Sequence, residues 1–262
     1  MKSPPRILDY LPPVALVAAL LLAWEGIVRF AHIPPFILPA PSLVLATLIS
    51  DRVTLFASLV ATLGTTFAAL FAAVAGGLVL AILFSQWRWL ERALLPIAVT
   101  LQVTPIIAIA PLLLIYLAPQ TAVLVCAFLV AFFPILANAA LGLASAERNL
   151  VDLFALYGAS RWQSLLWLRL PAALPYILAG VRIGGGLALI GAIVGELAAG
   201  ASGRETGLAF RIIEAGYRLE IPKMFAALAL ISLAGIAIFV LLSAVSHLLL
   251  RRWHESALDD AN

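Results

Sequence analysis

Long apolar runs separated by short polar segments dominate the pattern of residues along the chain. The runs do not alternate apolar and polar positions with a period of two, as the strands of a membrane barrel do. A bilayer core of about 30 Å needs about 20 helical residues, and six runs suit that length. The pattern therefore predicts an all-α, polytopic transmembrane bundle of about six spans within a single domain, residues 1–262. The predicted spans are Val14–Ala31, Ser58–Phe84, Leu90–Leu117, Thr121–Ala144, Leu174–Ala199 and Lys223–Leu250.

The segments between the runs predict the connections. Prolines crowd residues 33–41 and prevent the first helix from continuing, so a corner is expected there, followed by a short amphipathic helix over Ser42–Ser50. Residues Ser85–Trp89 predict a tight turn with tryptophans at the membrane interface. The longest polar interlude after a span runs from Ser145 to Arg169.

Lysine and arginine counts predict the orientation. With the N-terminus inside, nine basic residues fall in cytoplasmic segments and five in external ones, which predicts that both termini are cytoplasmic. The cytoplasmic set is Lys2, Arg6, Arg88, Arg92, Arg148, Arg161, Arg169, Arg251 and Arg252, and the external set is Arg52, Arg204, Arg211, Arg218 and Lys223. Glu205, Glu214 and Glu220 are expected to match the external basic residues.

Composition strengthens the membrane assignment. Hydrophobic residues make up 64% of the chain and charged residues 11%, whereas soluble domains contain roughly 45–50% apolar and about 25% charged residues. A soluble fold of this size needs more charge on its surface, so lipid must cover much of this one. The net charge of +3 is scattered among apolar runs, which disfavours a nucleic-acid-binding surface.

Candidate chemistry within the chain is sparse. Cys126 is the single cysteine, and three histidines accompany it, so the sequence predicts no metal site. Motifs such as H-E-x-x-H, G-x-S-x-G and G-x-x-x-x-G-K-[ST] do not occur, so we expect no catalytic residues and no cofactor bound by this chain. A secondary transporter remains an alternative, but no inverted repeat is visible.

One polar segment, residues 147–171, has a composition suited to a partner protein. Asp152 begins a short helix with Leu153 and Phe154 on one side, Gly158 interrupts it, and a second short helix is predicted to end at Pro171. An apolar patch flanked by charge and displayed beyond the membrane suits insertion into a groove on another protein.

This segment resembles a known family signature. Gly158, then nine residues, then Leu168-x-Leu170-Pro171, is similar to the cytoplasmic "EAA" loop of bacterial ABC importer permeases, the binding-protein-dependent (MetI-like) superfamily. Asp152 stands where the family usually has Glu. The resemblance implies a type I ABC importer permease fold in which this loop is the coupling helix that docks on an ATPase. The coupling candidates are Asp152, Leu153, Phe154, Tyr157, Gly158, Ala159, Arg161, Trp162, Leu168 and Pro171.

Other segments resemble the nitrate, sulfonate and taurine branch of that family. They are Trp24-Glu25, residues 33–42, residues 102–112, residues 133–138 and residues 191–197, although Ile106 replaces a residue that is commonly basic. The resemblance implies a bacterial inner-membrane subunit that pairs with a second copy, with ATPase subunits that carry ATP and Mg, and with an extracytoplasmic solute-binding protein. The implied solute is a small anion; a pyrimidine-like or riboflavin-like vitamin precursor is the alternative.

Polar residues and prolines inside the spans are candidates for lining the pathway. The set is Gln102, Thr104, Pro105, Tyr116, Asn138 and Glu196. For Glu196 a structural hydrogen-bond acceptor is the alternative to a pathway or gate residue. Glycines through the fifth span predict close helix packing, or a helix at a dimer axis. Arg182 is expected to snorkel or to pair with Asp152 or Glu147, and Glu25 with Arg29 to form an ion pair four residues apart.

Overall fold

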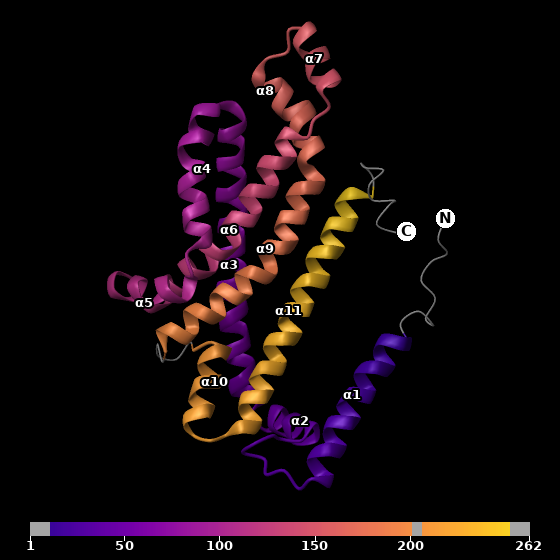
Figure 1. Cartoon of the computed structure of the whole chain (residues 1–262), viewed down its shortest axis with the longest axis vertical. Helices are drawn as coiled ribbons and strands as arrows, with labels where there is room; N and C mark the ends of the chain where they lie inside the picture. The colour runs from indigo at the N-terminus through magenta and orange to yellow at the C-terminus, as the bar shows by residue number, and fades with distance from the viewer. Residues whose placement is uncertain (1–10, 201–205, 252–262) are drawn as a thin grey trace.

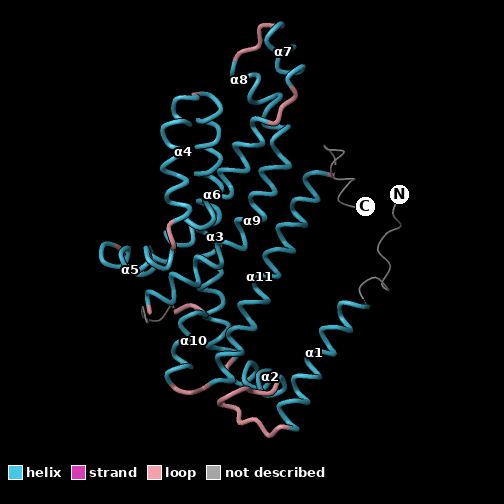
Figure 2. The backbone as a smooth tube through the Cα atoms, in the orientation of Figure 1, coloured by secondary structure: helices cyan, strands magenta, loops and turns pink. Residues whose placement is uncertain are grey.

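The computed structural model describes residues 11–200 and 206–251, and within these ranges the chain consists of helices joined by turns, without strands (Figures 1 and 2). The prediction of an all-α transmembrane bundle is confirmed. The helices are α1 Leu11–Phe30, α2 Pro41–Ser50, α3 Arg52–Gln86, α4 Arg88–Val103, α5 Ile106–Tyr116, α6 Pro119–Ala144, α7 Arg148–Leu156, α8 Arg161–Ser164, the π turn Leu165–Arg169, α9 Leu170–Ala199, α10 Leu208–Tyr217 and α11 Ile221–Leu250.

Five of these helical stretches, α1, α3, α6, the run from α8 through α9, and α11, are long and apolar enough to cross a membrane. The third predicted span, Leu90–Leu117, is instead two helices, α4 and α5, whose axes meet at 100°. Pro105 is the reason, because a proline disfavours helical geometry in the residue before it, and Thr104 has extended torsion angles. Pro111 lies inside α5 without ending it. The number of spans is six when the bent pair counts as one.

Helices α6 and α9 form the centre of the bundle, and α3 packs against both. A Cβ atom added at Gly191 of α9 would lie 2.7 Å from the Cα of Ala127 in α6, and one at Gly184 would lie 2.7 Å from the Cδ1 of Ile135. Residues without side chains thus let the two backbones approach closely. Gly180, Gly184, Gly191 and Gly195 therefore serve close packing of α9 against α6, as the first of the two alternatives predicts, whereas Gly186 faces open space.

The ends of the bundle differ. Helices α7 and α8 lie at one end, together with the turn between α3 and α4 and the C-terminal end of α11; α2 and α10 lie at the other end (Figure 1). Helix α1 diverges from the rest and touches it mainly at its lower part (Figure 1). There the predicted pair forms, with Arg29 Nε donating to Glu25 Oε1 at 2.6 Å. Glu25 also accepts hydrogen bonds from the backbone N–H and hydroxyl of Ser42, at 2.9 and 2.7 Å, and so fastens α1 to the start of α2.

Gly191→Ala should destabilise the bundle by about 1–3 kcal/mol, because the new methyl group meets the backbone of α6 rather than a flexible side chain. Thermal unfolding in detergent measures the change. Gly186→Ala is the matched control, since the same helix offers open space at that position. Equal melting temperatures for the two variants would contradict the close approach of α6 and α9.

Candidate functional site

The segment between α6 and α9 is held in shape by two backbone motifs placed back to back. At the end of α7, Gly158 has φ +68°, which favours glycine. The N–H of Ala159 donates to the carbonyl of Phe154 at 2.9 Å and that of Gly158 to Ala155 at 3.0 Å, the pair of bonds that defines a Schellman motif. A capping box then starts α8, in which Ser160 and Gln163 exchange hydrogen bonds of 2.7 and 3.2 Å. The corner at Gly158 is therefore rigidly defined.

The coupling candidates divide between the tip of this corner and its base. Tyr157 is 84% exposed and Trp162 57%, and Leu156, which the sequence analysis left out of the set, is also 84% exposed. Leu168, by contrast, is buried at the base. The tip candidates are Asp152, Leu153, Phe154, Tyr157, Gly158, Ala159, Arg161 and Trp162, of which Phe154 and Ala159 are half-buried.

The expected end of the second short helix at Pro171 is wrong. The helical run continues from Arg161 to Ala199, and Pro171 lies in the first turn of α9. Before it, the backbone makes a π turn in which the N–H of Leu170 donates to Leu165, five residues back. This turn is wider than an α-helical turn and shifts the register of the backbone hydrogen bonds just before Pro171. Because Pro171 has no N–H to donate, the shift lets the helix continue through it.

Three of the pathway candidates meet at the bend between α4 and α5. Gln102, Thr104 and Pro105 line a cavity of about 350 Å³, whose remaining wall comes from apolar residues of α4 and α5 and from α6 and α9, with Phe133 and Leu187 among them. The twelve residues that line the cavity include no acidic or basic side chain. Its chemistry is therefore that of an apolar pocket with an amide, a hydroxyl and exposed backbone at one side.

Tyr116 and Asn138 lie away from this cavity. Tyr116 ends α5 and is 83% exposed. The Asn138 amide donates to the carbonyl of Pro134 on its own helix at 2.8 Å, and its Cβ lies 2.8 Å from where a Cβ at Gly180 would be. Arg182 forms no ion pair with Asp152 or Glu147 in the described part of the chain.

Glu196, near the end of α9, is 7% exposed and holds the start of α10. Its carboxylate accepts the Thr62 hydroxyl at 2.7 Å and the N–H of Ala209 at 3.0 Å. Thr62 in turn accepts the N–H of Leu208 at 2.9 Å. Gly207 allows this contact, because a side chain there would overlap the Glu196 carboxylate. The arrangement satisfies two otherwise orphaned donors of the first turn of α10, as a structural hydrogen-bond acceptor does.

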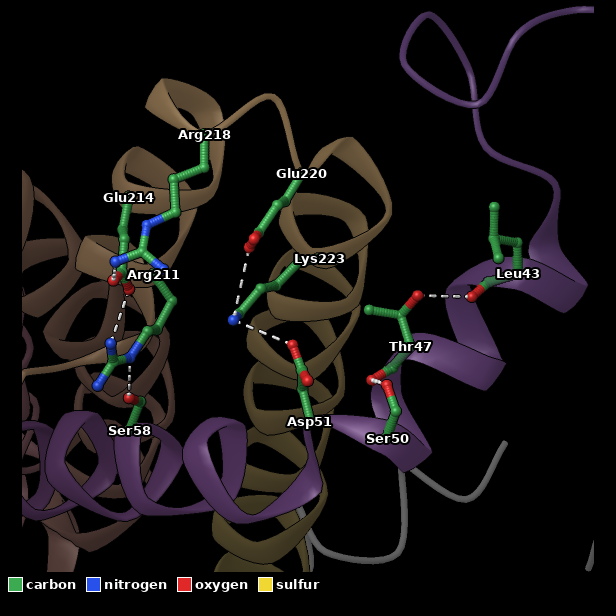
Figure 3. A network of polar contacts seen from close by, with 10 residues as sticks. All are labelled: Leu43, Thr47, Ser50, Asp51, Ser58, Arg211, Glu214, Arg218, Glu220 and Lys223. Carbon is green, nitrogen blue, oxygen red and sulfur yellow. Dashed lines mark hydrogen bonds and ion pairs between the residues drawn. The ribbon is translucent and has the colours of Figure 1, made fainter.

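A second polar network ties α10 and α11 to the first helices, as Figure 3 shows. Arg211 donates to Ser58 of α3 at 2.9 Å and pairs with Glu214 at 2.7 Å, and Arg218 pairs with the same carboxylate. The hydrogen bond from Arg211 lowers the pKa of Glu214 below its usual range. Lys223 of α11 bridges Asp51, at the corner between α2 and α3, at 3.0 Å. Glu214 and the nearby Glu220 thus match the basic residues as expected, and Glu205 lies outside the described residues.

Several residues of these networks were not singled out from the sequence. Thr62 and Gly207 carry no local signal, because their role depends on a partner far away along the chain. Ser160 and Gln163 do carry one, since Ser-x-x-Gln before a helical run is a capping-box pattern. For Lys223, which the sequence analysis did name, only the partner Asp51 was missed, because it lies far away along the chain.

The arrangement defines a class of protein: a multi-span helical membrane protein with a bent apolar cavity between spans and a shaped, partly apolar segment displayed at one end. Comparison with known families identifies the protein family more closely. The chain matches the family "binding-protein-dependent transport system inner membrane component" over residues 73–255 and belongs to it. It is therefore a permease subunit of an ABC importer, a non-catalytic membrane component, as the EAA-like spacing predicted.

Individual relatives cover nearly the whole chain. The riboflavin transport system permease protein of Chloroflexus aurantiacus is 36% identical over 93% of this chain and 90% of its own length. The formylaminopyrimidine transport permease protein of Halalkalibacterium halodurans is 32% identical, covering 94% and 97%. The taurine transport system permease protein of Escherichia coli is 30% identical, covering 92% and 89%. The relatives thus include transporters of both solute classes that the sequence analysis considered.

Thr62→Val should loosen the start of α10, because it removes one hydrogen bond to Glu196 and leaves the N–H of Leu208 buried without an acceptor. The expected loss is about 1–3 kcal/mol, and hydrogen exchange of residues 206–211 should rise. Thr65→Val is the control, since the Thr65 hydroxyl bonds only to Ala61 of its own helix. Unchanged exchange in the Thr62 variant would contradict the role given to Glu196.

Proposed function

We propose that residues 147–171 form the docking segment for a separate ATPase, on which ATP and Mg are bound, and that the movement of this segment drives transport. The observation that carries the proposal is the shape of the tip. Two opposed backbone motifs fix the corner at Gly158, and the apolar side chains of Leu156, Tyr157 and Trp162 stay exposed there. Exposed aromatic side chains on a rigid corner suit insertion into a groove on a partner protein.

The orientation and the partners belong to the same proposal. With α7 and α8 on the cytoplasmic side, the starting end of α1 and the final end of α11 point to that side as well (Figure 1), in keeping with the lysine and arginine counts. The segment then meets an ATPase in the cytoplasm, and the end with α2 and α10 meets the extracytoplasmic solute-binding protein. A second copy of the chain completes the pathway, and the pair sits in the bacterial inner membrane.

The cavity at the bend of α4 and α5 is proposed as the part of the pathway that meets the solute. Its walls offer the Gln102 amide and the Thr104 hydroxyl but no basic side chain, and Ile106 stands where a basic residue is common in the anion-transporting branch. A desolvated anion without a cationic partner is costly. The lining therefore favours an uncharged, ring-bearing solute of the vitamin-precursor kind over a small anion, and the names of two of the relatives agree with this.

Gly158→Lys should abolish the stimulation of ATP hydrolysis by the permease in liposomes, because φ +68° strains any residue with a side chain and the charged chain obstructs the tip. Copurification with the ATPase should fail as well. Gly200→Lys is the control for backbone strain away from the tip, since Gly200 also has a positive φ, +61°, with ψ −147°, a region that only glycine adopts readily, at the opposite end of α9. If the Gly158 variant copurifies and stimulates hydrolysis like the unaltered protein, the docking segment lies elsewhere.

Uptake assays with the assembled transporter distinguish the solutes. Riboflavin or formylaminopyrimidine should be imported and taurine should not. Thr104→Val should reduce uptake by about tenfold, the loss of one buried hydrogen bond to the solute. Thr100→Val is the matched control. Each hydroxyl donates to the carbonyl four residues back, at 2.9 Å for Thr100 and 2.8 Å for Thr104, but only Thr104 lines the cavity. Taurine uptake sensitive to Thr104 would instead establish the anion as the solute.

A further inference from the structure

A second cavity lies at the α7–α8 end of the bundle, between the turn that joins α3 to α4 and the segment that joins α6 to α9. Its volume is about 570 Å³, within the range of small-molecule sites. Three arginines line it: Arg88 from the start of α4, Arg161 from α8 and Arg169 from the π turn. Trp87 and Trp89 and the hydroxyl-bearing Ser85 and Ser164 complete its polar and aromatic wall.

The three arginines have no partners in the described part of the chain. Every ion pair there involves Arg29, Arg211, Arg218 or Lys223, and the guanidinium groups of Arg88, Arg161 and Arg169 donate no hydrogen bond to the described residues either. No carboxylate lines the cavity. A neighbouring cavity shares Ser85, Arg88 and Arg169 and contains one carboxylate, Glu91, which pairs with neither arginine.

Converging guanidinium groups without an internal counter-ion are unusual in a chain with so few charges. Arg161 and Arg169 come from one helical run, eight residues apart, whereas Arg88 comes from the start of α4, far away along the chain, so the fold and not local sequence brings it to the other two. Arginine presents a planar fork of donors that matches the oxygens of a phosphate, and such pairs are frequently bidentate. Tryptophans concentrate where the headgroups of a bilayer lie, and two of them stand at this cavity.

We propose that this cavity binds a phosphate group, held by Arg88, Arg161 and Arg169 and flanked by Trp87 and Trp89. The phosphate comes from the headgroup of an anionic phospholipid or from a soluble phosphate compound of the same chemistry. Three positive charges around one cavity attract an anion more strongly than a single exposed arginine does. Because Arg161 and Phe154 also belong to residues 147–171, a bound phosphate would brace that segment against the α3–α4 turn.

The test uses the full-length chain, stripped of lipid in a neutral detergent, and native mass spectrometry with an equimolar mixture of phosphatidylglycerol and phosphatidylcholine. We expect about tenfold preference for phosphatidylglycerol, and a fall to about twofold or less in the double variant Arg88→Gln, Arg169→Gln. Arg92→Gln is the matched control, because it removes the same charge from the next turn of α4 and lines neither cavity. Melting temperatures check that each variant folds.

If the double variant does not fold, Arg161→Gln replaces it, since this side chain is exposed on α8 and its loss should lower the preference by about threefold. Glycerol 3-phosphate and inorganic phosphate, added as soluble probes, distinguish the sources. Arginine-dependent binding of phosphatidylglycerol identifies a lipid headgroup, and arginine-dependent binding of a soluble probe alone identifies a free phosphate compound; both support the proposal.

Two results would overturn the proposal. In one, Arg92→Gln lowers binding as much as the double variant does, which would mean diffuse surface charge rather than a site. In the other, the binding of neither kind of phosphate probe depends on the arginines. The proposal then fails, whether or not the double variant also loses its affinity for the ATPase. An accompanying loss of that affinity would show that the cavity receives acidic side chains of the partner instead.

Discussion

The close approach of α6 and α9 is the contact on which the rest of the structure depends. Lipid removes most of the hydrophobic driving force between helices, so their association relies on packing and on hydrogen bonds. Positions such as Gly184 and Gly191 let backbone and short side chains touch where any larger residue would separate the helices. Helices α3 and α11 then pack on this pair, whereas α1, which lacks such contacts, stays largely exposed along its length.

Polar contacts add to packing where the short helices join the bundle. Helix α10 is too short to cross a bilayer, and it is fixed by Glu196 at its start and by the Arg211 pairs along its length. Lys223 joins α11 to the corner at Asp51 in the same way. Partners of this kind are expected near the membrane, because an unsatisfied polar group at membrane depth has a large free-energy penalty. The ion pairs of α10 and Lys223 thus lie where short helices join the long ones.

The predictable features are those that depend on local sequence. Span length and apolar content revealed most of the transmembrane helices, and the turn at Gly158 followed from a residue suited to a positive φ. A kink in the third span is expected from Pro105 and Pro111, and the chain does bend at Pro105, but the sequence does not tell which proline bends it, since Pro111 and Pro134 lie within helices that continue through them. Whether a proline kinks or ends a helix depends on the packing around it. The prediction that a helix ends at Pro171 was wrong for the same reason, because a π turn precedes the proline and the helix continues through it.

One continuous helical run connects the features at the two ends of the molecule. Residues 161–199 carry Arg161 and Arg169 at the cavity of the α7–α8 end and Glu196 at the start of α10. A displacement of residues 147–171, the proposed docking segment, would therefore act on the contact between Glu196 and α10 through a single element, whose glycine face lies against α6. The π turn at Leu165–Arg169 is the one stretch of this run with altered hydrogen-bond register, which makes it the natural position for the run to flex. Because Arg169 ends that turn and also lines the phosphate cavity, occupancy of the cavity would bear directly on how stiffly the segment and the span are joined.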